Sequence, residues 1–193
     1  MAPTSSADHL SEPQRQTLLT QARTSIEYGL VEARPMPVAA AEFEADLRRE
    51  QASFVTLREA DGGLRGCMGS SQPVRPLIED VSRNAYSAAF LDPRFSPLQA
   101  DEAEDLHIHL SVLTPLEEMA VASEQELLDQ VRPGVDGLLV EEGQRRGTLL
   151  PSVWEALPDP RRFLYELRRK ADLPGDYWSP TLKIFRYATE SFE

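Results

Sequence analysis

A β-hairpin is predicted by the stretch SFVTLREADGGLRGCMG, residues 53–69. Residues 53–58 form a largely apolar run, and the Asp61-Gly62-Gly63 segment that follows is typical of a turn, because glycine reaches positive φ without strain. Residues 64–69, with the sequence LRGCMG, form the returning strand. Glycines inside a strand weaken it, so Gly66 and Gly69 indicate a bulge or the close approach of another backbone or a ligand.

Cys67 is the single cysteine of the chain, which excludes an internal disulfide and a cysteine-based zinc site. Its glycine neighbours leave room for a substrate near the sulfur. On a regular strand Arg65 shares a face with Cys67, and a nearby cation favours the thiolate. Cys67 is therefore a candidate nucleophile. The alternative is that Cys67 packs as a small apolar residue, as free cysteines usually do.

A helix is predicted from Ser11, which has capping-box spacing with Gln14 and is followed by Pro13 in the first turn. Apolar residues recur every four positions as far as Leu30, and the helix ends before Pro35. We expect residues 1–10 to form a flexible tail and residues 11–193 to form one domain. One possible arrangement of this domain is two lobes with a cleft at the 64–69 hairpin. A second, short helix is expected over residues 39–50.

The remaining elements alternate between helices and strands. Helices are expected over residues 76–91, 123–130 and 159–171, strands over 106–112 and 181–190, and a second hairpin over 138–150. Short turns between strands imply antiparallel pairing. The predicted class is α+β, a largely antiparallel sheet with flanking helices.

His107 and His109 point the same way on the predicted strand, with Asp105 on the same face. Two imidazoles about 7 Å apart need a further ligand from elsewhere, so we expect a solvated strand face and no metal site. The sequence contains no Gly-x-Ser-x-Gly elbow, P-loop or Gly-x-Gly-x-x-Gly, and no cofactor is expected.

The net charge is −12, from 20 basic and 32 acidic residues among 193. Residues 101–142 are strongly acidic, and basic residues gather between Arg145 and Lys170. An acidic protein is repelled by nucleic acid, so nucleic-acid binding is disfavoured, although the basic segment leaves an RNA-binding hypothesis open. No span has the roughly 20 apolar residues of a membrane helix, and the N-terminus lacks the pattern of a secretory signal. We expect a cytoplasmic protein.

The segment LRGCMG resembles the LRGCIG signature of the AMMECR1 family, with Met68 in the place of isoleucine. Further segments resemble the same family, in the same order along the chain: 54–57 (FVTL), 92–95 (DPRF), 111–114 (SVLT), 134–138 (GVDGL) and 146–154 (RGTLLPSVW). We therefore identify the chain as similar to AMMECR1-family proteins from about Phe54 to Trp178.

The resemblance implies a mixed α/β fold and an activity that is not established for the family. It also implies association with a Memo-like protein and a radical SAM protein. Two hypotheses follow. In the first, Cys67 reacts with a small-molecule ligand in a cleft, and the candidate binding residues are Arg65, Gly66, Gly69, Asp92 and Arg94. In the second, the chain is a non-catalytic adaptor, and the LRGCMG hairpin has a structural role.

Overall fold

The computed structural model describes residues 9–193. The chain divides into two compact units: the first is formed by the residues up to Leu113 together with Glu190–Glu193, and the second by Thr114–Thr189. A four-stranded sheet and an apolar core occur in each unit of the described chain. The strand pairs β1–β2, β1–β3, β4–β7, β5–β6 and β5–β7 are antiparallel, so the predicted α+β class is confirmed.

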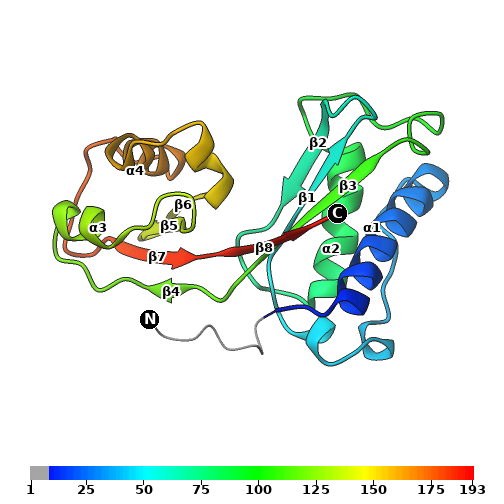
Figure 1. Cartoon of the computed structure of the whole chain (residues 1–193), viewed down its shortest axis with the longest axis horizontal. Coiled ribbons are helices and arrows are strands. Elements are labelled where there is room, and N and C mark those ends of the chain that lie inside the picture. The colour runs from blue at the N-terminus through cyan, green and yellow to red at the C-terminus, as the bar shows by residue number, and fades with distance from the viewer. Residues whose placement is uncertain (1–8) are drawn as a thin grey trace. The chain divides into compact units, whose positions relative to one another are not determined.

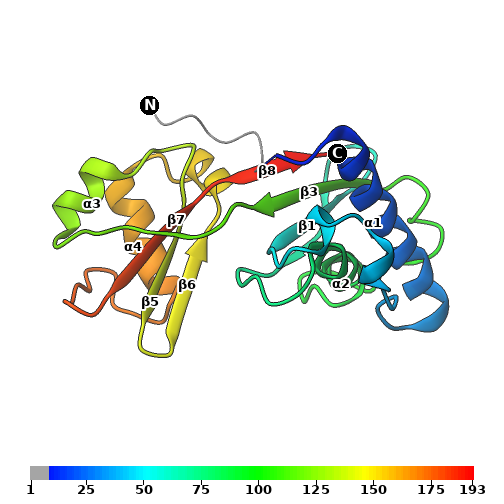
Figure 2. The ribbon, with the colours of Figure 1, turned by 90° about the horizontal axis from the view of Figure 1, so that it is seen from below.

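The first unit has two helices on one side of its sheet (Figures 1 and 2). Its strands follow the order β2-β1-β3-β8. The elements are α1 (Glu12–Glu32), β1 (Ser53–Arg58), β2 (Leu64–Gly69), α2 (Leu77–Phe90), β3 (His107–Leu113) and β8 (Thr189–Phe192). Alternate residues of β1, Val55 and Leu57, are fully buried in the core beneath the helices. Phe54 and Thr56 therefore lie on the opposite face.

The predicted start of α1 is confirmed. The Ser11 side chain accepts from the Gln14 N–H, and the Gln14 side chain accepts from the Ser11 N–H, which completes a capping box. Residues 1–8 of the predicted tail lie outside the described residues. Leu10 is buried, and its N–H donates to Glu190 Oε2 at 3.1 Å.

The hairpin is confirmed, and it contains an irregularity in its register. Leu57 lies opposite Gly66, whereas Arg58 lies opposite Leu64. Arg65 is consequently an extra residue on β2 that has no partner on β1. A bulge of this kind re-aims the side chain of the extra residue. The alternation of a regular strand therefore does not set the direction of Arg65.

The second unit comprises β4 (Glu117–Glu118), α3 (Glu124–Gln130), β5 (Gly137–Glu142), β6 (Arg145–Leu149), α4 (Pro160–Lys170) and β7 (Lys183–Tyr187). Its strand order is β4-β7-β5-β6. The Phe163 ring of α4 is fully buried and stacks on Trp154, with ring centroids 3.8 Å apart. The Trp154 indole N–H donates to the Asp136 carbonyl at 2.7 Å, so the ring is fixed at both its apolar and its polar end.

The helix predicted over residues 39–50 is wrong. The segment contains two single 3₁₀ turns, Ala40–Glu42 and Asp46–Arg48. Phe43, between the two turns, has an extended backbone with φ −100° and ψ 163°, so the helix is interrupted there. The Gln14 side-chain amide of α1 donates to Glu44 and Asp46 and so holds the second turn against the helix.

The strand predicted over residues 181–190 is two strands that belong to different sheets, β7 and β8. The break falls at Ala188, whose N–H donates to Thr114 Oγ1 and whose carbonyl accepts from the Thr114 N–H, both at 2.9 Å. Along the described residues no helix is long and apolar enough to cross a membrane.

Candidate functional site

Cys67 lies on the face of the first sheet opposite α1 and α2, which we call the helix-free face because no helix of this unit, over the described residues, packs on it. The Cys67 side chain is half-buried, and its Sγ is 3.3 Å from Thr56 Oγ1. Thr56 is directly opposite Cys67 in the β1–β2 register. The thiol is therefore held beside a hydroxyl group that can donate a hydrogen bond to it or accept one from it.

The backbone of Cys67 is fixed by two residues of the predicted DPRF motif. The Cys67 N–H donates to Asp92 Oδ2 at 2.8 Å, and the Cys67 carbonyl accepts from Arg94 Nη2 at 3.3 Å. Strand β2 is an edge of the sheet, so these backbone groups point away from β1 and would otherwise be unpaired. Asp92 and Arg94 thus satisfy the sheet edge at Cys67.

Asp92 and Arg94 also form an ion pair in which two nitrogens of the guanidinium contact the carboxylate. Arg94 Nη2 is 2.7 Å from Asp92 Oδ2, and Arg94 Nε is 3.0 Å from Asp92 Oδ1. The Asp92 side chain is buried, whereas that of Arg94 is 54% exposed. The hydrogen bonds from Arg94 hold the pKa of the Asp92 carboxyl well below its usual range, and burial opposes this only in part.

Arg65 is buried and paired with Glu102, in the loop between α2 and β3. Its Nε is 2.7 Å from Glu102 Oε1 and its Nη2 is 3.0 Å from Glu102 Oε2, while Nη2 also donates to the Ser96 carbonyl. These hydrogen bonds lower the pKa of Glu102. Arg65 Nη1 is buried and has no hydrogen-bond partner among the described residues. The guanidinium charge is thus largely compensated inside the protein.

Both glycines of the LRGCMG segment lie against protein atoms. A Cβ on Gly66 would overlap the carbonyl oxygen of Ala88 in α2, and a Cβ on Gly69 would overlap the Phe54 ring. Packing of β2 on α2 and β1 is therefore sufficient to explain why these positions are glycine. Of the six predicted site residues, the structure brings together Cys67, Asp92 and Arg94, and it places Arg65 in a separate ion pair.

His107 and His109 are on β3, and His109 lies on the helix-free face. His109 is opposite Thr56, and its Nδ1 is 3.9 Å from Glu193 Oε2. Within residues 9–193, no group of three His, Cys, Asp or Glu side chains is arranged to hold a metal ion. Thr56 and Glu102 were not among the predicted site residues. A regular hairpin register would have paired Cys67 with Val55, so Thr56 becomes its partner only through the bulge at Arg65. Glu102 is 37 positions from Arg65 and carries no local signal.

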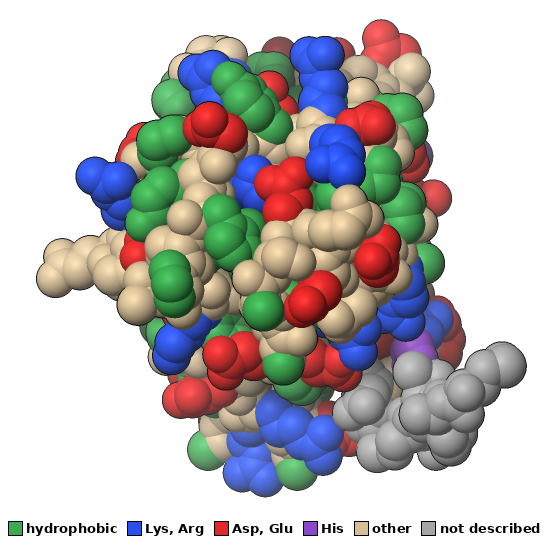
Figure 3. Space-filling model, turned by 90° about the vertical axis from the view of Figure 1, so that its left-hand side faces the viewer, with side chains coloured by type: hydrophobic (Ala, Val, Ile, Leu, Met, Phe, Trp, Pro, Cys, Tyr) green, Lys and Arg blue, Asp and Glu red, His purple; other side chains and the backbone are tan. Residues whose placement is uncertain are grey.

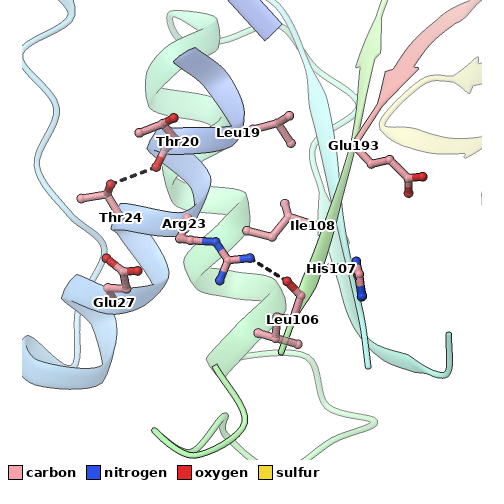
Figure 4. Close-up of a pocket in the computed structure, with 9 residues that line it drawn as sticks. All are labelled: Leu19, Thr20, Arg23, Thr24, Glu27, Leu106, His107, Ile108 and Glu193. Atoms are coloured by element: carbon pink, nitrogen blue, oxygen red, sulfur yellow. Dashed lines mark hydrogen bonds between the residues drawn. The ribbon is translucent and has the colours of Figure 1, made fainter. Parts of the chain in front are cut away.

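A solvent-accessible cavity of about 580 Å³ lies between α1 and the start of β3 (Figure 4). Arg23 spans it and donates to the carbonyls of Leu106, at 2.6 Å, and Ala103, at 3.1 Å. Thr24 donates to the Thr20 carbonyl of its own helix. The Arg23 guanidinium and the Thr24 hydroxyl are therefore already used in hydrogen bonds within the protein.

Three arginines of the basic segment of the second unit are paired with acidic residues. Arg168 Nη2 is 2.6 Å from Glu124 Oε2, Arg161 Nη1 is 3.3 Å from Glu124 Oε1, and Arg146 Nη1 is 3.0 Å from Glu141 Oε1. On the face shown in Figure 3, Lys and Arg side chains are interspersed with Asp and Glu side chains. This pairing weakens the phosphate-binding potential of the basic segment.

The fold and the site define an α+β protein in which an edge strand with a fixed backbone presents one thiol next to a hydroxyl group. The AMMECR1 family model matches residues 19–192, so the chain belongs to the AMMECR1 family. A protein of Methanothermobacter thermautotrophicus is 38% identical over 189 residues and covers 95% of each chain. Protein MJ0810 of Methanocaldococcus jannaschii is 40% identical over 147 residues, which are 72% of this chain and 71% of that one.

Among solved structures, the chain is similar to the crystal structure of the uncharacterized protein PH0010 from Pyrococcus horikoshii. The TM-score is 0.78 at 33% sequence identity, and the match covers 90% of this chain and 88% of that one. The family membership expected from the sequence motifs is confirmed, and the relatives are uncharacterized proteins.

Proposed function

We propose that this AMMECR1-family protein presents Cys67 as a nucleophile to an electrophilic small molecule. We further propose that it does so in the cytoplasm, together with a Memo-like protein and a radical SAM protein. The observation that carries the proposal is the placement of the thiol. Cys67 is half-buried on the helix-free face, and its peptide group is fixed on both sides by Asp92 and Arg94. A fixed backbone places the sulfur reproducibly, which a nucleophile requires.

Alkylation of the folded protein by iodoacetamide between pH 5 and 10 tests the proposal. Cys67 is the single cysteine, so the mass gained by the intact protein reports that thiol alone. We expect alkylation of the native protein to be faster than that of a short unstructured peptide with the same thiol at pH 7. Cys67→Ser is the matched control and gains no mass. If alkylation waits for denaturant, the nucleophile hypothesis is wrong.

The second candidate is a non-catalytic adaptor. It is favoured by one observation: Arg65, Gly66, Asp92 and Arg94 all have contacts within the protein that explain their presence. An adaptor would bind a Memo-like or radical SAM protein with an affinity that falls as salt rises, because charged surfaces steer such association. Titration calorimetry with Cys67→Ala distinguishes the two candidates. Unchanged binding together with an unreactive native thiol would support the adaptor.

A further inference from the structure

A second cavity of the first unit, of about 480 Å³, lies at the C-terminal ends of α1 and α2. Gly29 of α1 packs there against two aromatic residues of α2, since a Cβ on this glycine would lie 2.5 Å from the Phe90 ring and 2.8 Å from the Tyr86 ring. The third wall is the loop that follows α2, and the Leu98 N–H ties this loop to the helix by donating to the Ala89 carbonyl at 2.9 Å. The walls of the cavity are thus fixed by contacts within the protein.

The lining of this cavity is apolar and aromatic. Apart from Tyr86 and Gln99, its residues are glycine, alanine, leucine, proline and phenylalanine, and no charged side chain of residues 9–193 is among them. The Tyr86 and Phe90 rings have centroids 4.9 Å apart and are tilted by 40°, so together they offer ring faces and edges to a further aromatic ring. An uncharged ligand fits such a lining, because a charge that leaves water without a partner is costly.

The Tyr86 hydroxyl is a polar group of this cavity that the protein leaves unused. Tyr86 is 8% exposed, and among residues 9–193 its hydroxyl has no hydrogen-bond partner. A buried tyrosine usually pairs its hydroxyl. The Tyr86 oxygen is nevertheless accessible to solvent, and Tyr86 lines the cavity, so a molecule bound there can reach it. The hydroxyl can donate a hydrogen bond to such a molecule or accept one from it.

The size of the cavity favours a small molecule as its occupant. A volume of about 480 Å³ is within the range of about 300–1,000 Å³ that is typical of ligand pockets. Gln99 is exposed at the opening, where its side-chain amide donates to the Pro97 carbonyl at 2.9 Å and its backbone N–H donates to Glu102 Oε2 at 2.7 Å. Leu91 of the lining is 57% exposed, so the competing occupant is a second copy of the chain that covers this apolar rim.

We propose that this cavity binds a small, uncharged aromatic molecule whose polar group forms a hydrogen bond with the Tyr86 hydroxyl. The aromatic part of the molecule packs on the Tyr86 and Phe90 rings, and its polar group pairs with a hydroxyl that has no partner within the described protein. The site is distinct from the proposed nucleophile, because none of the residues of the LRGCMG segment lines it. The inference therefore does not depend on the reactivity of Cys67.

The test is a titration of the full chain with indole, followed by the ¹H–¹⁵N NMR spectrum. Indene is the matched probe, because it has the same two-ring skeleton and no hydrogen-bonding group. Tyr86→Phe removes the hydroxyl and keeps the ring. The matched control variant is Tyr28→Phe, since it removes the hydroxyl of a tyrosine of α1 that is next to Gly29 in the sequence but does not line the cavity. Cys67→Ser tests whether binding is independent of the thiol.

We expect indole to shift the backbone amide signals of residues 29–33, 86–91 and 98–100. In Tyr86→Phe the Kd of indole should rise about two- to tenfold, which corresponds to the loss of one neutral hydrogen bond. The Kd of indene should not rise in this variant. Tyr28→Phe and Cys67→Ser should bind both probes as the native protein does.

Three outcomes overturn the inference. If the signal changes are absent or spread over both units, the cavity does not bind an aromatic molecule. If indole has the same Kd for the native protein and Tyr86→Phe, or if the Kd of both probes rises equally, the hydroxyl does not select the ligand. If the same signals shift when the protein is diluted without a probe, a second copy of the chain covers the cavity.

Discussion

Gly66 lies where strand β2 packs closely on the backbone of helix α2. The atom that a Cβ would overlap is the carbonyl oxygen of Ala88, which belongs to helix backbone and cannot rotate away. The sequence showed that a glycine inside this strand needs an explanation, and it left open whether a ligand or the protein itself approaches. The structure supplies a protein neighbour for Gly66 and for Gly69, so neither glycine needs a ligand to explain it. Cys67 remains the candidate reactive residue of LRGCMG.

The first prediction concerns this close approach. Gly66→Ala should destabilise the fold by about 1–3 kcal/mol, because the strand must move off the helix to make room for one methyl group. The measurement is the urea midpoint. Gly62→Ala is the control, since that turn glycine has open space around it and only its positive φ resists substitution. A smaller loss for Gly66→Ala than for Gly62→Ala would contradict the packing argument.

The second prediction uses the ion pair behind Cys67. Arg94 depresses the pKa of Asp92 in the folded protein. A depressed folded-state pKa contributes stability that is complete above the unfolded value of about 3.9 and is lost as pH falls below it. The free energy of unfolding should therefore decrease from pH 4 toward pH 2, and this decrease should be smaller in Asp92→Asn.

Asp92→Asn should itself cost about 1–3 kcal/mol at pH 7, because a buried charge-assisted hydrogen-bond partner is lost. Chemical denaturation at each pH measures both effects. Asp159→Asn is a suitable control, since that carboxylate caps α4 from an exposed position and asparagine caps a helix about equally well. Equal pH dependence of Asp92→Asn and the native protein below pH 4 would count against the role given to the pair.

At the scale of elements, local patterns predicted the capping box of α1 and the hairpin, because both depend on residues a few positions apart. The errors occurred where contacts between residues far apart in the sequence determine the local structure. Residues 39–50 are held by Gln14 and do not continue as a helix, and the chain near Ala188 changes sheets because Thr114 pairs with it. The Arg65–Glu102 pair is of the same kind. Thr56 belongs with them, because counting residues back from the hairpin turn pairs Cys67 with Val55, and the bulge at Arg65 moves the partner to Thr56.

The third prediction concerns the buried carboxylate that ties three elements together. Asp80 of α2 is fully buried and accepts hydrogen bonds from the N–H and hydroxyl of Ser53, at the start of β1. It also accepts from Ser70 after β2, from Arg75, and from Asn84 one turn further along α2. One carboxylate thus fixes both strands of the hairpin against the helix.

Asp80→Asn should destabilise the protein by about 3–5 kcal/mol, because it replaces an acceptor-only group and leaves the buried donors without a charged partner. A lower urea midpoint with an unchanged slope is the expected result. The matched control is Glu79→Gln, the preceding residue of the same helix, for which less than about 0.5 kcal/mol is expected. Similar midpoints for the two variants would contradict the bracing role of Asp80.

At the scale of the whole molecule, the described chain has two apolar cores that share no residue, one in each unit. Composition and length allowed one domain or two joined lobes. The pattern of strands could not decide between them, because it does not show which strands share a sheet. The assignment of β7 and β8 to different sheets is a property of the folded molecule and not of their sequence.

The fourth prediction follows from the separate cores. Leu57→Ala removes a fully buried side chain of the first core and Phe163→Ala one of the second, and each should cost about 2–5 kcal/mol. Because the sites share no contact partner, the double variant should lose the sum of the two costs within about 0.5 kcal/mol. In native-state hydrogen exchange, each single variant should lose protection mainly in its own unit, since protection follows the stability of each cooperative region. Loss of protection across both units in either variant would show that the two cores unfold as one.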